Sequence, residues 1–284
     1  KIAVTAFFEA STRTRTSFES AILRLDGKII SIADGSSTGQ AKGESLRDIG
    51  EMFNAYADLV IMRHTDTDAP EQILENLRAP LINAGNGTGE HPTQALADWF
   101  ALLKWQPRLA EPYRRGQPKL NLGILGTPGS MRAVKSFLLM ALLFRDHIRK
   151  VTVISEMADP FGEEITARLT EAGITYQVTN DVREHLPDLD VIYMNSIAFL
   201  GDSYKTLDSR YKLNAESPLK EDAVILHPLA RREELDTSLD KTSHNLYFSQ
   251  AHGAIFMRQA LLMAVLGRLK ALPSFIDMGN PSTD

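Results

Sequence analysis

The chain has 284 residues, 43% of them hydrophobic and 24% charged, which is enough for one large domain or two ordinary domains with hydrophobic cores. Its formal net charge of −5 is spread along the sequence, which argues against a nucleic acid or an anionic membrane as the main partner. Cysteine is absent and no apolar run approaches the roughly 18 residues of a membrane span, so thiol chemistry and disulfides are excluded and a cytoplasmic protein without a signal peptide is expected.

The first third of the chain alternates apolar runs with segments of helical spacing. Because Lys1 directly precedes an apolar run, we expect a further N-terminal piece before this numbering. The predicted strands are Ile2–Phe8, Lys28–Ala33, Leu59–His64 and Leu81–Ala84. The predicted helices are Ser17–Leu25, Glu44–Ala57, Glu71–Arg78 and Pro92–Trp105.

A second alternating series follows the Pro-, Arg- and Gly-rich segment Gln106–Lys119, which is typical of a linker. The predicted strands are Leu120–Leu125, Lys150–Ile154, Thr175–Val178, Val191–Met194 and Ala223–Leu226, and the predicted helices are Arg132–Phe144, Phe161–Ala172, Val182–Leu186 and Ile255–Lys270. Two such series predict an α/β protein with two doubly wound parallel-sheet domains, residues 1–105 and 119–250. The last helix, 255–270, is expected to pack back on the first domain.

A polar segment, Ser11–Arg15, separates the first predicted strand from the helix after it. The start of a helix offers unpaired backbone N–H groups and the positive end of a dipole. Hydroxyl and guanidinium groups add further donors for a phosphate or another compact oxyanion. A plain helix cap with two solvated arginines is the alternative. Two arginines among hydroxyl residues, placed between two core elements, favour the anion site.

Further polar groups lie where ligands bind in parallel sheets, beyond the carboxyl ends of strands. Arg63 closes a buried strand and either solvates its end or brings a second positive charge to an oxyanion. His91 lies near the cap of the helix at Pro92, one turn before Gln94. The two side chains can address one carbonyl-plus-amide group, or serve as a capping His and a solvated Gln.

Lys42 lies in a small, polar, glycine-containing segment, Ser36–Ser45, which is either an ordinary loop or a loop that reaches a neighbouring site. The glycines of Leu122–Arg132 follow the pattern G-x-x-G-x-x-G, which differs from the dinucleotide fingerprint and disfavours a nucleotide-dependent enzyme. Arg132 opposes the dipole of the helix that it begins, and a carboxylate-bearing ligand would explain its position.

Pro228 ends the last predicted strand of the second series. The carbonyl groups of Pro228 and Leu229 are then free to accept hydrogen bonds from an NH₂ group, although a plain surface loop explains the segment equally well. The seven histidines show no metal-binding spacing, so we predict no metal.

Together these motifs resemble the aspartate/ornithine carbamoyltransferase family, on its aspartate side, from Phe7 to Leu269. The string FFEASTRTR matches the carbamoyl phosphate signature of that family, and AKGE, MRH, HPTQ and HPL also occur in it. Pro228 stands where ornithine enzymes usually carry cysteine.

The resemblance implies a site for carbamoyl phosphate and a reaction without a cofactor. The phosphate would be bound by Ser11, Thr12, Arg13, Thr14 and Arg63. The carbonyl oxygen would be polarised by Thr14, Arg63 and His91, and the NH₂ group would be bound by Gln94 and the carbonyls of Pro228 and Leu229. An amine would attack to form an anionic tetrahedral intermediate, which such donors stabilise by about 3–4 kcal/mol each.

The resemblance also implies an acceptor site shared between subunits of a homotrimer. Arg132, oriented by Glu9, would bind the α-carboxylate of the acceptor, with Leu229 close by. Lys42, with Ser37 or Thr38, would reach into the site of the neighbouring subunit. A regulatory subunit is left open.

The expected reaction is carbamoyl transfer to L-aspartate, giving N-carbamoyl-L-aspartate and phosphate for pyrimidine biosynthesis. The Thr-Arg-x-Gln motif usual after Met194, whose Arg binds the second carboxylate of aspartate, is absent. Lys205, Arg210 and Arg231 are the candidate replacements, although Lys and Arg are not equivalent at such a site. A different amino acceptor and a non-catalytic anion-binding homologue remain as alternatives.

Overall fold

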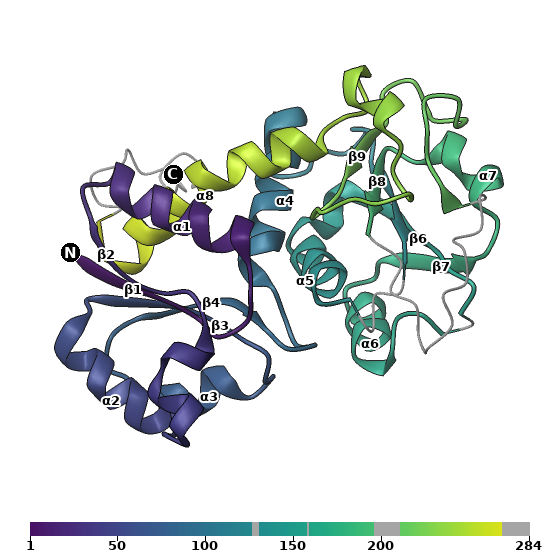
Figure 1. The fold of residues 1–284 in the computed structure, drawn as a ribbon. Coiled ribbons are helices and arrows are strands. Elements are labelled where there is room, and N and C mark those ends of the chain that lie inside the picture. Colours follow the sequence, from purple (N-terminus) through teal and green to yellow (C-terminus); the bar gives the residue numbers. More distant parts are fainter. Residues whose placement is uncertain (127–130, 158, 196–210, 269–284) are drawn as a thin grey trace, which may run out of the picture. The chain divides into compact units, whose positions relative to one another are not determined.

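The computed structural model describes residues 1–126, 131–157, 159–195 and 211–268, without the side chain of Ser37 (Figure 1). The chain divides into two compact units. Unit 1 comprises Lys1–Arg63, Asp68–Ile82 and the described residues from Ile255 onward. Unit 2 comprises His64–Thr67 and Asn83–Ala254. Neither unit is continuous in the sequence.

The first sheet has four strands in the order β2-β1-β3-β4. Its strands are β1 (Ile2–Phe7), β2 (Lys28–Ile32), β3 (Leu59–His64) and β4 (Leu81–Asn86). The accompanying helices are α1 (Thr12–Arg24), α2 (Leu46–Tyr56) and α3 (Ala69–Leu74), with the 3-10 helices η1 (Gly35–Ser37) and η2 (Gly39–Lys42). β1 pairs in parallel with both β2 and β3.

The second sheet has five strands in the order β7-β6-β5-β8-β9, and each neighbouring pair is parallel. Its strands are β5 (Leu120–Leu125), β6 (Ile148–Ile154), β7 (Thr175–Thr179), β8 (Val191–Met194) and β9 (Val224–Leu226). The helices are α4 (Pro92–Trp105), α5 (Arg132–Ala141), α6 (Glu163–Glu171), α7 (Val182–His185) and α8 (Tyr247–Val265), with 3-10 helices at Pro107–Ala110, Leu142–His147, Leu186–Asp188 and Thr237–Lys241. The predicted α/β class with two parallel sheets is confirmed.

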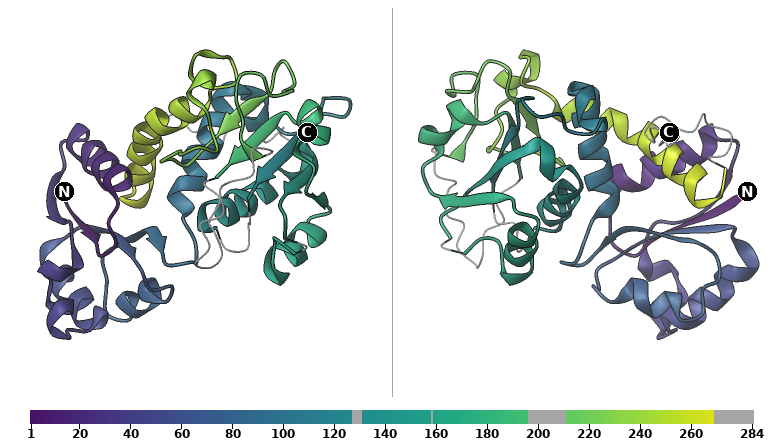
Figure 2. Two further views of the ribbon diagram at one scale, coloured as in Figure 1. Left: turned by 45° about the vertical axis from the view of Figure 1, so that its right-hand side comes forward. Right: turned by 180° about the vertical axis from the view of Figure 1, so that it is seen from behind.

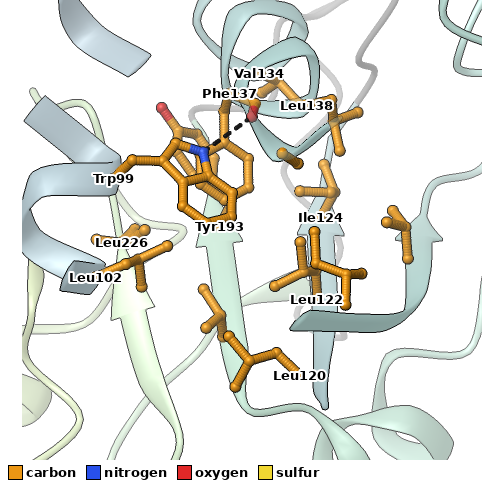
Figure 3. Close-up of a cluster of buried hydrophobic side chains, with 14 of the residues drawn as sticks. Trp99, Leu102, Leu120, Leu122, Ile124, Val134, Phe137, Leu138, Tyr193 and Leu226 are labelled. Carbon is orange, nitrogen blue, oxygen red and sulfur yellow. Dashed lines mark hydrogen bonds between the residues drawn. The ribbon is translucent and has the colours of Figure 1, made fainter. Parts of the chain in front are cut away.

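Both faces of the second sheet are buried, and successive strand residues belong to opposite faces. In β8, Val191 and Tyr193 pack in the cluster that contains α4, α5 and α6, whereas Ile192 and Met194 pack in the cluster that contains α7. Figure 3 shows the first cluster around Trp99, whose indole N–H donates to the carbonyl of Phe137 at 3.1 Å. This packing fixes α4 on the sheet, and two predicted site residues depend on it, Gln94 in the helix and His91 at its N-cap.

In unit 1, α2 and α3 cover one face of the sheet, where their apolar side chains meet Val4, Ala6, Val60 and Met62. The opposite face carries α1, and the Thr5 hydroxyl donates to Glu19 of that helix at 3.0 Å (Figure 1). The residues of α8 from Ile255 onward lie beside α1, where Arg258 donates to the hydroxyl of Ser17 (Figure 2).

The starts of α2, α3 and α6 lie two residues from those predicted, and the starts of α1 and α8 differ more. α1 begins at Thr12 instead of Ser17, because Ser11 takes the N-cap position and the polar residues after it form the first turn. α8 begins at Tyr247 instead of Ile255. Here the Asn245 side chain accepts a hydrogen bond from Phe248 N at 3.3 Å and starts the helix two turns earlier. In the segment predicted as a linker, Leu109 is buried in the core of unit 2.

Candidate functional site

The N-terminus of α1 has the features of an anion-binding helix start. Ser11 is at the N-cap in extended conformation, but its side chain makes no capping hydrogen bond. Thr14 is buried on the inner side of the first turn. Arg13 is exposed, and among the described residues its side chain has no ion-pair or hydrogen-bond partner. The first turn therefore keeps its N–H groups and one cation for a ligand.

Arg63, at the end of β3, is only 9% exposed. Its Nη2 lies 2.9 Å from Oε1 of Glu9, and both residues belong to unit 1. Burial of a guanidinium is costly unless a partner compensates its charge. The carboxylate of Glu9 does so, and it fixes the direction of the Arg63 side chain.

Lys42 ends the second of the two short 3-10 helices and is exposed. Asp34 caps the first of these helices by accepting from Ser36 N at 3.0 Å, and Gly43 ends the second with φ of 89°, a left-handed conformation that glycine adopts at little cost. Within the described part of the chain, Lys42 has no ion-pair partner. The segment thus presents its cation to solvent.

In unit 2, His91 is the N-cap residue of α4 and Pro92 takes the first helical position. The backbone N–H of buried His91 donates to the Ser136 hydroxyl at 2.9 Å, which ties the helix start to α5. Gln94, one turn further, donates from Nε2 to Oδ1 of Asp98 at 2.7 Å. The two residues of the predicted pair are therefore held by different neighbours, His91 by Ser136 and Gln94 by Asp98.

Asp98 is fully buried and joins three elements of unit 2. Besides Gln94 it accepts hydrogen bonds from the Tyr193 hydroxyl, at 2.9 Å, and from Nε2 of Gln250 on α8. Burial and the adjacent Asp98 carboxylate raise the pKa of Tyr193 well above its usual value, so the tyrosine stays a donor. Asp98, Tyr193 and Gln250 were not predicted as site residues from the sequence. The signal for Asp98 was an acid inside the apolar stripe of α4.

Arg132, at the start of α5, donates from Nη1 to the Gly87 carbonyl at 2.7 Å. Gly87 has φ of 50°, and a Cβ atom there would lie 2.5 Å from the Thr65 carbonyl oxygen. Only glycine fits at position 87 of this turn, and the carbonyl of Gly87 holds the guanidinium of Arg132 at the start of α5.

The segment after β9 is organised around the buried His227. Its Nδ1 accepts from Leu229 N at 2.8 Å, so its Nε2 carries the proton and donates to Glu234 Oε1 at 3.0 Å. Burial of Glu234 opposes ionisation, but the hydrogen bonds from His227 and the backbone outweigh burial and lower its pKa. The backbone N–H of His227 donates to Gln250 Oε1 at 2.9 Å. The Pro228–Leu229 segment is thereby fixed from both sides.

Of the three candidate cations for a second carboxylate of the acceptor, the structure describes only Arg231. Its guanidinium is paired with both carboxylate oxygens of Asp240, with Nη2 at 2.7 Å from Oδ2. Lys205 and Arg210 lie outside the described residues. Throughout the described part, no group of three or more His, Cys, Asp or Glu side chains has the arrangement of a metal site, and no helix is long and apolar enough to cross a membrane.

Comparisons with known proteins agree on one family. The carbamoyl-P binding domain of aspartate/ornithine carbamoyltransferase matches residues 1–104, and its Asp/Orn binding domain matches residues 119–265. The chain is 39% identical over 274 residues to the aspartate carbamoyltransferase catalytic subunit of Aliivibrio fischeri, which covers 94% of this chain and 85% of the relative. The corresponding protein of Vibrio vulnificus is 38% identical with the same coverage.

Solved structures of aspartate transcarbamoylase from Trypanosoma cruzi have a similar fold. The complex with carbamoyl phosphate and aspartate is 28% identical, with a TM-score of 0.78, over 92% of this chain and 82% of that chain. The complex with carbamoyl aspartate and phosphate has a TM-score of 0.79, at the same identity and coverage.

Proposed function

The chain belongs to the aspartate/ornithine carbamoyltransferase family, and from this premise we propose that it transfers the carbamoyl group of carbamoyl phosphate to the amino group of L-aspartate. The products are N-carbamoyl-L-aspartate and phosphate, for pyrimidine biosynthesis in the cytoplasm. The observation that carries the proposal is the start of α1, with an uncapped first turn and an exposed Arg13. The names of the relatives and the ligands in the T. cruzi complexes support it.

The donor binds through its phosphate to the start of α1. The ligands are Ser11, Thr12, Arg13, Thr14 and Arg63. Backbone N–H groups and the helix dipole favour the dianion, and Arg13 is available because it has no competing partner among the described residues. Arg63, directed by Glu9, adds a charge whose desolvation is already compensated.

The carbamoyl group is polarised and oriented by residues of the same predicted set. Thr14, Arg63 and His91 stabilise the carbonyl oxygen, where negative charge develops in the tetrahedral intermediate. Gln94 and the carbonyls of Pro228 and Leu229 accept from the NH₂ group. The acceptor amine attacks the carbonyl carbon, phosphate leaves with its electron pair, and the departing phosphate takes the amine proton.

Arg132 binds the α-carboxylate of the acceptor, beside Leu229, and its anchoring on Gly87 supports this role because a fixed guanidinium loses little entropy on binding. Arg231 is already paired with Asp240, which weakens its candidacy for the second carboxylate. We place that contact in the segment after Met194. Lys42 completes the site of a neighbouring chain in a homotrimer, in agreement with its exposure and lack of an ion-pair partner among the described residues.

The proposal is tested by measuring phosphate release from carbamoyl phosphate with a panel of amines that includes aspartate and ornithine. We expect release with aspartate, and a 100- to 1000-fold lower kcat/KM, on the order of an oxyanion-site deletion, in Arg13→Ala. Arg24→Ala, at the opposite end of the same helix, is the matched control and should remain active. The melting temperature of both variants should stay close to that of the parent, since both side chains are exposed.

Release with another amine would keep the chemistry and change the acceptor. No release with any amine, in a protein that still binds phosphate, would replace the enzyme by a non-catalytic anion-binding homologue.

A further inference from the structure

We infer that Asp98 is a positioning residue, which turns the amide of Gln94 so that its oxygen faces the NH₂ group of the carbamoyl donor. The inference deepens the proposed function and rests on its assignment of Gln94 to that NH₂ group. Asp98 itself does not touch the donor in this scheme. It acts through two glutamines, both in unit 2.

The geometry at Asp98 is that of an acceptor surrounded by donors. Its Oδ1 accepts from Nε2 of Gln94, at 2.7 Å, and from Nε2 of Gln250, while its Oδ2 accepts from the Tyr193 hydroxyl at 2.9 Å. The three donors come from α4, α8 and β8. Hydrogen bonds donated to a carboxylate favour its ionised form, which can only accept.

An acceptor-only partner decides which end of an amide faces it. Each glutamine must turn its nitrogen to Asp98, and its oxygen then points the other way. Gln250 has this orientation, because its Oε1 accepts a hydrogen bond from the backbone N–H of His227 at 2.9 Å. Gln94 is half-exposed, and its Oε1 accepts no hydrogen bond from the described residues. The exposed end of Gln94 is therefore an acceptor, as an NH₂ group requires.

The same carboxylate also supports the second set of acceptors for that NH₂ group. Gln250 links Asp98 to the backbone of His227, and the Pro228 and Leu229 carbonyls follow directly. One buried acid thus holds both sides of the proposed NH₂ pocket. A fully buried acid is a costly way to stabilise a fold, since apolar residues of similar size pack there at less cost. A role in orienting Gln94 and Gln250 explains why α4 carries a buried acid at this position.

The test compares the affinities of the protein for two phosphate compounds that differ only in the group bound to the carbonyl carbon. Acetyl phosphate has a methyl group where carbamoyl phosphate has NH₂, so the ratio of their affinities reports recognition of the NH₂ group. Inorganic phosphate reports the phosphate site alone. We expect the parent protein to prefer carbamoyl over acetyl phosphate by about tenfold or more, the size of one or two buried hydrogen bonds.

In Asp98→Ala that preference should fall close to one, while the affinity for inorganic phosphate changes less than about twofold, because the phosphate ligands keep their places. Asp98→Asn should restore most of the preference. Its amide oxygen can still accept from both glutamines, and its NH₂ group can donate to the Tyr193 hydroxyl oxygen. Tyr193→Phe is the matched control, because it removes a bond to the same carboxylate and leaves both glutamine bonds.

A preference that survives in Asp98→Ala, or is lost equally in Asp98→Asn, would overturn the inference. If Asp98→Ala does not fold, hydrogen exchange of the parent decides. The side-chain NH₂ resonance of Gln94, assigned by its loss in Gln94→Met, should exchange slowly with solvent. Exchange as fast as that of a surface amide would show that the nitrogen does not face Asp98.

The outcome is separable from that of the proposed function, which is judged by carbamoyl transfer in the parent protein. Loss of the preference in Asp98→Ala without any transfer in the parent would keep the inference and reject the enzyme. Carbamoyl transfer in the parent without any preference for carbamoyl over acetyl phosphate would keep the enzyme and reject the inference.

Discussion

At the scale of single residues, several buried ionisable groups of this protein are paired with side chains that hold a loop or a helix end in place. His227 and Glu234 illustrate the principle. The histidine accepts from Leu229 N and donates to Glu234, so that a neutral imidazole and an ionised carboxylate complement each other inside unit 2. Their hydrogen bonds lower the pKa of Glu234 despite its burial. A depressed carboxyl pKa ties stability to pH.

We expect Glu234 to stabilise the fold above the pKa of an unfolded glutamate, about 4.3, and this contribution to be lost as pH falls through the lower folded pKa. Glu234→Gln, which keeps the shape and removes the charge, should cost about 2 kcal/mol at pH 7, and the difference from the parent should shrink below pH 4. Thermal unfolding of both proteins from about pH 3 to about pH 8, in steps of about 0.5 unit, measures this pH dependence of the stability difference.

Glu233→Gln, in the exposed neighbour that pairs with Lys212, is the control and should leave the melting temperature nearly unchanged. A Glu234→Gln difference that stays constant down to pH 3, well below the unfolded pKa of about 4.3, would show that the charge is not what stabilises the segment.

At the scale of elements, the starts of α1 and α2 show two uses of the same residue type. Ser45 is the N-cap of α2, and its hydroxyl accepts from Asp48 N at 3.1 Å. Ser11 has the same position in α1 but makes no capping bond. One helix start satisfies its own N–H groups, whereas the other keeps them for a ligand.

The two serines should therefore respond differently to removal of the hydroxyl. Ser45→Ala should lower the free energy of unfolding by about 1 kcal/mol and leave the affinity for phosphate unchanged. Ser11→Ala should cost less stability and weaken phosphate binding by about tenfold, one hydrogen bond to a charged group. Chemical unfolding and phosphate titration of both variants give the comparison. Equal stability losses would mean that Ser11 is an ordinary cap.

At the scale of the whole molecule, the proposed site needs more than one chain. Lys42 is exposed in unit 1 and has no ion-pair partner among the described residues. In the proposed homotrimer it serves the neighbouring site, so that the Arg13 and the Lys42 of one site come from different chains. Activity then becomes a property of the assembly.

Lys42→Ala and Arg13→Ala chains should each be nearly inactive as homo-oligomers, and mixed oligomers should regain activity. In a symmetric trimer that contains both kinds of chain, about one third of the sites receive both intact residues. Co-expression of two differently tagged chains, tandem purification and the phosphate-release assay measure this. Mixed oligomers of confirmed mass without activity would place Lys42 in the site of its own chain.

Features of this protein that depend on local chemistry could be predicted from the amino-acid sequence. Residue spacing located β3, β5 and β8 with their observed bounds, because a buried parallel strand is a continuous apolar run. The same spacing was less reliable at helix starts. In α1 the polar residues after Ser11 form the first turn, and in α8 the side chain of Asn245 accepts a hydrogen bond from Phe248 N, so both helices begin earlier than the apolar pattern does.

Which polar groups meet in space could be seen only in the folded chain. Asp98 and Gln250 are 152 positions apart, and no local pattern relates them. Glu9 and Arg63 are 54 positions apart, at the ends of neighbouring strands. Whether a buried acid is isolated or satisfied depends on donors that the fold brings from other elements, since hydrogen bonds and ion pairs act over a few ångströms in space and not along the chain.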